Sequence, residues 1–139
     1  IFAMGPEYAP VGDIRQLLSG TPPVMSMLAM QGMLDHLADA GVTAVRAKSI
    51  SLTEFAVRAY DELLAPLGVR LLSPRSAAGR GGHITIGHPD FQQVTQQLWG
   101  EGVIPDFRFP DGIRLGLSPL STSHEETLRG VVAVRDALS

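Results

Sequence analysis

The chain has 139 residues, of which 45% are hydrophobic and 18% are charged, and it carries a formal net charge of -3 at pH 7. This length suits one domain with a substantial core, and this composition excludes a disordered tail. Lysines and arginines are not clustered, and no apolar run reaches the length of a membrane span, so the sequence argues against nucleic-acid and membrane partners. Cysteine is absent, which excludes disulfides and a cysteine nucleophile.

The first 22 residues are punctuated by proline and glycine and lack the periodic pattern of a helix or strand. They nevertheless include residues of the kind that proteins usually bury. Loops of this length are uncommon inside compact domains. We therefore assign residues 1–22 to a connecting segment and residues 23–139 to a small domain, and we expect the chain to have been cut from a longer protein.

Two helices are predicted next, over residues 24–40 and 43–64. The first carries apolar residues at i, i+3, i+4 and i+7, a stripe that is more typical of core packing than of a ligand surface. That stripe consists of Met30, Met33, Leu34 and Leu37. The second helix carries Lys48, the only lysine of the chain, which we expect to be exposed rather than to form a Schiff base with an aldehyde cofactor.

The remaining elements alternate between strands and helices. Residues 69–73 and 83–88 read as strands, and the "GRGGH" run between them reads as a flexible turn. A third helix is predicted to begin at Pro89. A last helix is predicted after Ser123, whose side chain forms a capping box with Glu126. Its residues expected to face inward are Leu128, Val131, Val132 and Leu138.

Between the last two helices, residues 105–117 read as a hairpin whose alternate residues are apolar. A loop of residues 110–112 would place Phe109 opposite Ile113 and Arg108 opposite Arg114. The residues expected on the core-facing side are Phe107, Phe109, Ile113, Leu115 and Leu117.

On the other face of the hairpin, Arg108 and Arg114 would form a pair of like charges, which is unfavourable by a few tenths of a kcal/mol to about 1 kcal/mol. Gly116 would leave open space beside Arg114. Two hypotheses follow: the arginines form an anion-binding site, or they lie at a solvated edge of the sheet with both side chains extended into water. Arg108 has a further interpretation, a purely structural ion pair with Asp106.

This order of elements favours an α+β fold, in which a small, mainly antiparallel sheet is covered on one face by helices. The uncovered face would carry Arg108 and Arg114. No metal site is predicted, because His83 and His88 are five residues apart on a strand and so lie on opposite faces. No set of nucleophile, base and orienting residue can be assembled, so the chain alone is not expected to be a competent enzyme.

Three motifs, in this order and spacing, resemble the C-terminal third of kynureninase, a family of fold-type I, pyridoxal-phosphate-dependent enzymes in the class V aminotransferase group. They are "GTPP" at residues 20–23, "RAKS" at residues 46–49, and "GVIPDFR" with "GIRLGLSPLSTS" within residues 102–123. The resemblance covers nearly the whole chain. It implies that the Schiff-base lysine lies upstream, outside this chain, and that the chain is the small domain with its connecting segment.

The resemblance also implies the activity: hydrolysis of L-kynurenine, or its 3-hydroxy form, to an anthranilate and L-alanine in tryptophan catabolism and NAD biosynthesis. Arg114 matches the family's arginine for the substrate α-carboxylate, and Thr21 matches the position that hydrogen-bonds the cofactor phosphate across a dimer interface. We expect a cytoplasmic homodimer. Its large domain and partner subunit would contact an apolar patch that includes Ile1, Phe2 and Tyr8.

The family often reads Pro-Leu-Tyr where this chain has Pro119, Leu120 and Ser121. That difference could alter the wall of the pocket and leaves room for a different substrate. Two alternatives therefore remain open: the small domain of another class V enzyme, such as a cysteine desulfurase or an aminotransferase, and a free-standing ligand-binding module.

Overall fold

The computed structural model describes residues 6–7, 9–18 and 20–139. The chain divides into two compact units, Ile1–Asp39 and Ala40–Ser139, and each is described by itself. The predicted apolar patch of Ile1, Phe2 and Tyr8 lies outside the described residues. The assignment of residues 1–22 to a connecting segment concerns a longer protein and stays a prediction.

The first unit contains the helix α1 (Val24–Ala40), which confirms the helix predicted there. The expectation that its apolar stripe fills a core is wrong for this structure, because none of its residues is buried. Met30, Met33 and Leu34 are each about half exposed or more. Periodicity identifies the face of a helix that avoids water, but it does not identify what covers that face.

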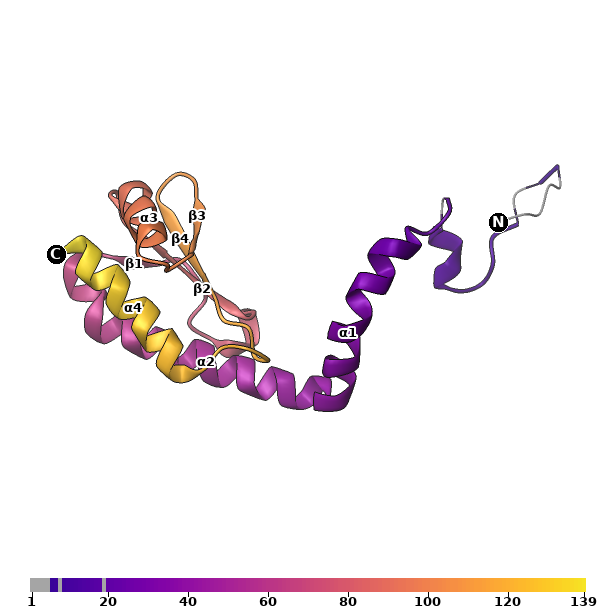
Figure 1. Ribbon diagram of the computed structural model, residues 1–139, viewed down its shortest axis with the longest axis horizontal. Helices are drawn as coiled ribbons and strands as arrows, with labels where there is room; N and C mark the ends of the chain where they lie inside the picture. Colours follow the sequence, from indigo (N-terminus) through magenta and orange to yellow (C-terminus); the bar gives the residue numbers. More distant parts are fainter. Residues whose placement is uncertain (1–5, 8, 19) are drawn as a thin grey trace. The chain divides into compact units, whose positions relative to one another are not determined.

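The second unit is built on a four-stranded sheet (Figure 1). The strand order is β1-β2-β4-β3, and every neighbouring pair is antiparallel. The strands are β1 (Arg70–Leu71), β2 (His83–Gly87), β3 (Asp106–Arg108) and β4 (Gly112–Gly116). The helices are α2 (Val42–Leu63), α3 (Phe91–Gly100) and α4 (His124–Leu138). These elements confirm the α+β class with a small antiparallel sheet.

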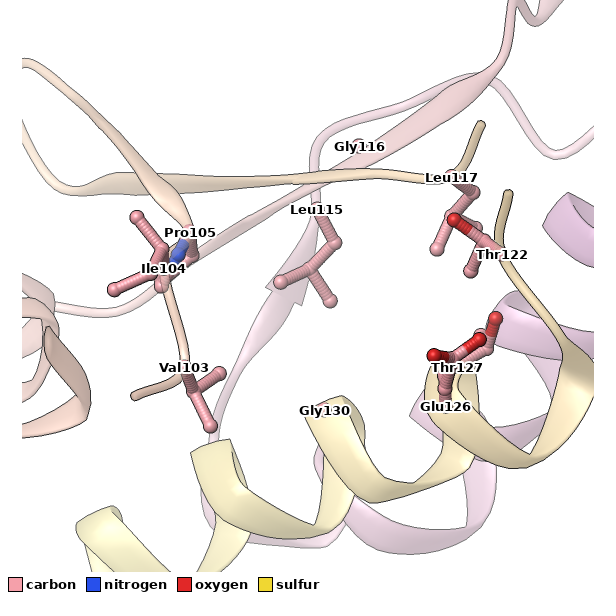
Figure 2. A pocket seen from close by; sticks show the side chains of 10 residues that line it. All are labelled: Val103, Ile104, Pro105, Leu115, Gly116, Leu117, Thr122, Glu126, Thr127 and Gly130. Carbon is pink, nitrogen blue, oxygen red and sulfur yellow. The ribbon is translucent and has the colours of Figure 1, made fainter. Parts of the chain in front are cut away.

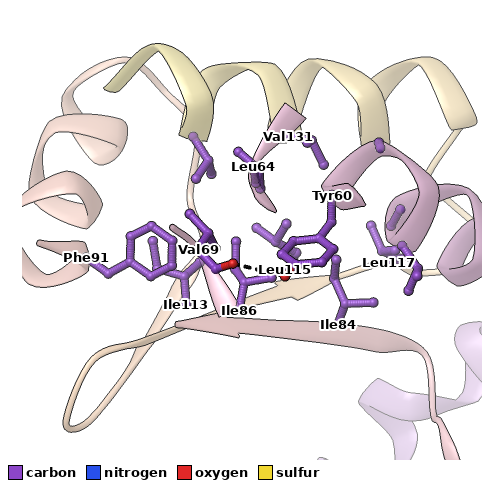
Figure 3. Packing of buried hydrophobic residues seen from close by; sticks show 14 of the residues in the cluster. Tyr60, Leu64, Val69, Ile84, Ile86, Phe91, Ile113, Leu115, Leu117 and Val131 are labelled. Carbon is purple, nitrogen blue, oxygen red and sulfur yellow. Dashed lines mark hydrogen bonds between the residues drawn. The ribbon is translucent and has the colours of Figure 1, made fainter. Parts of the chain in front are cut away.

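The helices cover one face of this sheet (Figure 3). Alternate residues of β2 and β4 point toward them, and Ile84, Ile86 and Ile113 are fully buried there. Burial of each such side chain stabilises the fold by about 1.5 to 3 kcal/mol. Tyr60 of α2 donates a hydrogen bond from Oη to the carbonyl oxygen of Val69 at 2.9 Å, which satisfies its polar group inside the core.

Two helix starts can be compared with their predictions. The prediction for α3 is wrong by two residues, because the amide of Phe91 donates to the carbonyl of His88 and closes a turn that contains Pro89. The capping box of α4 is confirmed, since Glu126 N donates to Ser123 Oγ at 3.0 Å and Ser123 N to Glu126 Oε2 at 2.8 Å.

The buried stripe of α4 also differs in part from its prediction. Val131 is fully buried as expected, but Leu128 is exposed and Val132 and Leu138 are only partly buried. The buried positions are spaced four and three residues apart, which is the spacing of one helix face. They are Thr127, Val131 and Val134.

Candidate functional site

The hairpin of β3 and β4 pairs in a register two residues away from the predicted one. Arg114 lies opposite Asp106, and Arg108 lies opposite Gly112. The predicted pairing of Arg108 with Arg114 and of Phe109 with Ile113 is therefore wrong. Phe109 lies in the loop and is 91% exposed, so it does not belong to the core-facing row either.

Charge and space both favour the observed register. It places the opposite charges of Asp106 and Arg114 across from each other, whereas the predicted register would have paired two cations. It also places a glycine where the strands approach closely: a Cβ on Gly112 would lie 3.1 Å from the carbonyl oxygen of Arg108. A shift of two residues keeps the same side chains on each face, so alternation alone does not distinguish the two registers.

Asp106 joins the two predicted site arginines. Its Oδ2 atom accepts a hydrogen bond from Arg108 Nη2 at 2.6 Å and another from Arg114 Nη2. The ion pair with Arg108 was one interpretation from the sequence and is present. The ion pair with Arg114 was missed, although residues 106 and 108 share a strand face and the strand opposite carries Arg114.

The site lies on the open face of the sheet. A Cβ on Gly112 would lie 3.4 Å from the Cβ of Arg108 and 3.6 Å from Cγ2 of Thr85, so these side chains share that face. Arg114 lies opposite Thr85 on β2, and its side chain is 39% exposed. A Cβ on Gly116 would meet no atom within 4 Å, which confirms the predicted space on this face. Arg114 is thus fixed at its base and accessible at its guanidinium.

A second ion pair lies on the same face, between Arg70 of β1 and Asp111 of the hairpin loop. The Arg70 guanidinium passes beside Gly87, where a Cβ would lie 3.1 Å from its Nη2 atom. The sequence interpretation missed this pair. The face on which Arg70 lies follows from the alternation of β1, but a strand of two residues is too short for its faces to be assigned from sequence.

The remaining predicted positions lie outside β3 and β4 in the chain. Thr21 is exposed and precedes α1 in the first unit. Lys48 is half-buried on α2, so it is less exposed than expected. Within residues 6–7, 9–18 and 20–139, no group of three His, Cys, Asp or Glu side chains could hold a metal ion. None of the helices in those ranges combines the length and the hydropathy that a membrane span requires.

A small cavity of about 150 Å³ lies between β4 and the start of α4 (Figure 2). Its walls include Leu115 and Leu117, which face the core, so it is distinct from the open face that carries Arg114. Glu126 contributes its one carboxylate. The hydrogen bonds from Ser123 hold the pKa of that carboxyl below its usual value, and its Oε2 atom takes part in the helix cap.

The fold and its open face define an α+β domain whose helices cover one side of the sheet and whose other side carries Arg70, Arg108 and Arg114. A family model described as the kynureninase C-terminal domain matches residues 45–134. The chain therefore belongs to the kynureninase C-terminal domain family.

Curated relatives agree with this family. A kynureninase of Deinococcus radiodurans is 39% identical over 140 residues, which cover 99% of this chain and 34% of the relative. Kynureninases of Pseudomonas fluorescens and Burkholderia mallei are 34% and 35% identical over 137 residues, which cover 99% of this chain and 33% of each relative. The chain spans about a third of the length of the curated relatives it matches.

Proposed function

We propose that this chain is the C-terminal part of a cytoplasmic, homodimeric hydrolase that uses pyridoxal phosphate. The enzyme cleaves L-kynurenine, or its 3-hydroxy form, with water to give an anthranilate and L-alanine, a step of tryptophan catabolism. This proposal is supported by the family and by relatives that carry the name kynureninase. The large domain would supply the lysine that binds the cofactor.

The observation that carries the proposal is the position of Arg114. Its strand is pinned by the fully buried Ile113 beside it, while its guanidinium is part-exposed on the open face. A planar guanidinium with five donors can hold both oxygens of a carboxylate at once. Arg114 would therefore bind the substrate's α-carboxylate and fix the orientation of the amino-acid carbon that reacts.

Two donors each suit an implied partner on their own: the part-exposed guanidinium of Arg114 suits a carboxylate, and the exposed hydroxyl of Thr21 suits a phosphate. Thr21 is exposed, so its hydroxyl is free of the core and suits a phosphate oxygen. When bound, pyridoxal phosphate supplies the electron sink for the bond cleavage. Arg114 would orient the substrate, and Arg108 would strengthen the positive field around it.

An assay of the full-length protein tests the proposal. We expect release of an anthranilate and L-alanine from L-kynurenine, and no sulfide from L-cysteine. The comparison of L-kynurenine with L-cysteine matters because Ser121 stands where the family often has tyrosine, a difference that leaves room for another substrate. Ser121 is exposed in the turn after Pro119. Turnover of L-cysteine, or transamination without anthranilate, would contradict the proposal and favour another class V enzyme.

A further inference from the structure

One carboxylate oxygen serves both site arginines. Asp106 Oδ2 accepts from Arg108 Nη2 and from Arg114 Nη2, so the guanidinium proposed to bind the substrate already holds an internal carboxylate. A second carboxylate that arrives at Arg114 must share that guanidinium with Asp106 or displace it. Two carboxylates at one guanidinium repel each other, unless another cation compensates for the charge.

Arg108 is placed to be that cation. It lies two residues from Asp106 on the same strand and on the same face, and its side chain is 53% exposed. The position across from it is Gly112, which presents no side chain that would crowd the guanidinium. Asp106 can therefore keep Arg108 as a charged partner when the Arg114 guanidinium binds a second carboxylate. The alternative of two unpaired arginines would leave like charges side by side.

We propose that Asp106 is a positioning residue for Arg114, and that Arg108 retains Asp106 when a carboxylate binds Arg114. The inference rests on the proposed function of Arg114. Before binding, Asp106 holds the Arg114 guanidinium near its working position. On binding, the remaining donors of Arg114 take the ligand carboxylate, and Asp106 stays with Arg108, so the cluster gains no uncompensated negative charge.

Substitutions of Asp106 and of Arg108 should then change the kinetics in different ways. Asp106→Asn removes one negative charge that both orients Arg114 and competes with the ligand carboxylate. We therefore expect kcat to fall about tenfold while carboxylate affinity stays equal or improves. Arg108→Gln leaves Asp106 to Arg114 alone, so carboxylate affinity and KM should worsen about tenfold with little change in kcat. In the Asp106→Asn background, Arg108→Gln should have a clearly smaller effect, because only the field of Arg108 at the ligand is then lost and no Asp106 charge is left for it to retain.

The experiment uses the full-length enzyme with its cofactor. Wild-type cleavage of L-kynurenine is measured first, and its absence would count against the proposed function rather than against this inference. The four members of the double-mutant cycle are then compared by kcat and KM. Their dissociation constants for 4-oxo-4-phenylbutanoate, which keeps the substrate's carboxylate and aryl ketone but lacks both of its amino groups, are measured by calorimetry, a readout that needs no turnover.

Arg70→Gln is the matched control, because it removes an arginine paired with an aspartate on the same face but outside the cluster. It should leave both constants unchanged. Arg108→Lys keeps the charge and should restore most of the affinity lost in Arg108→Gln. Equal effects of Arg108→Gln with and without Asp106, or no effect of Asp106→Asn on kcat, would overturn the inference.

Discussion

Arg80 and Glu54 form an ion pair that fastens the glycine-rich loop before β2 to helix α2. Only 1% of the Arg80 side chain is exposed, and its Nη1 atom also donates to the carbonyl oxygens of Pro74 and Arg75 at 2.8 and 2.5 Å. The interpretation of this run as a flexible turn is therefore wrong at Arg80. Glycine content indicated a loop, but it did not indicate that the arginine inside the run is buried.

Glu54→Gln should destabilise the chain by about 2 to 3 kcal/mol, because it leaves a buried guanidinium without its counter-charge. The control is Asp61→Asn on the same helix, which breaks a surface pair with Arg75. That change should cost less than about 1 kcal/mol. Urea unfolding of the two variants gives the comparison, and equal losses would show that the Arg80 pair contributes no more than a surface pair.

Phe91 and Phe109 make a second matched comparison, since the first is fully buried and the second is 91% exposed. Phe91→Ala should cost about 3 to 5 kcal/mol, because it leaves a cavity in the core. Phe109→Ala should change the free energy of unfolding by less than about 0.5 kcal/mol. A large loss for Phe109→Ala would place its ring in a packed environment and would support the predicted hairpin register instead.

The helices and the sheet were predictable because their patterns are local. The period of α2, the alternation of β2 and the Ser123 capping box each depend on neighbouring residues alone. The hairpin register was not predictable in this way, because pairing Phe107 or Phe109 with Ile113 puts the same side chains on the same face. The apolar stripe of α1 was predicted, but its exposure was not, because the pattern of a helix does not specify what covers it.

The candidate site was predictable in part. Alternation placed Arg108 and Arg114 on the open face, and Gly116 indicated the space there. The residue that joins the two arginines depends on the register. Only the observed register places Asp106 opposite Arg114, where it can bind both arginines. A contact across strands is fixed by pairing, which the alternation of each strand does not specify.

The Glu126 carboxylate should make the stability of α4 depend on pH. The backbone and side-chain hydrogen bonds of Ser123 lower its pKa in the folded chain. A lowered carboxyl pKa adds stability above the ordinary value of about 4.3, and that stability is lost as pH falls through the folded value. Wild type should therefore exceed Glu126→Gln in Tm at pH 7, and the difference should shrink below pH ~4.

Glu125→Gln is the control at pH 7, because Glu125 is exposed in the same turn but is not the capping-box residue. It should lower Tm less than Glu126→Gln does, because it removes no capping-box hydrogen bond. Ser123→Ala should lower the free energy of unfolding by about 1 kcal/mol, because it removes the side-chain cap. A pH profile of Glu126→Gln parallel to that of wild type would contradict the coupling.

In the full-length enzyme, Arg114→Lys should lower kcat/KM about a hundredfold. Lysine keeps the charge but not the planar fork, so it cannot hold both carboxylate oxygens in one orientation. Cofactor content, measured by absorbance, should be unchanged. Arg108→Lys should be much milder. Near-normal turnover of Arg114→Lys would remove Arg114 from the substrate site and favour the solvated-edge hypothesis.

The 139-residue chain by itself should not retain pyridoxal phosphate. Its only lysine, Lys48, lies half-buried on α2, next to the buried Ser49. After incubation with the cofactor and gel filtration, the protein should show no visible absorbance band. A retained band that disappears in Lys48→Ala would show that this lysine reacts with the aldehyde.

Helix α1 buries none of its residues, whereas every buried residue that the structure describes lies between Ser49 and Val134. The two units should therefore protect their amides very differently from hydrogen exchange. Amides of α1 should exchange at rates set by the helix alone, and those of β2 and β4 at rates set by global unfolding. A protease should accordingly trim the chain toward Gly41 and leave a resistant piece that holds the sheet, its helices and the Asp106 cluster together.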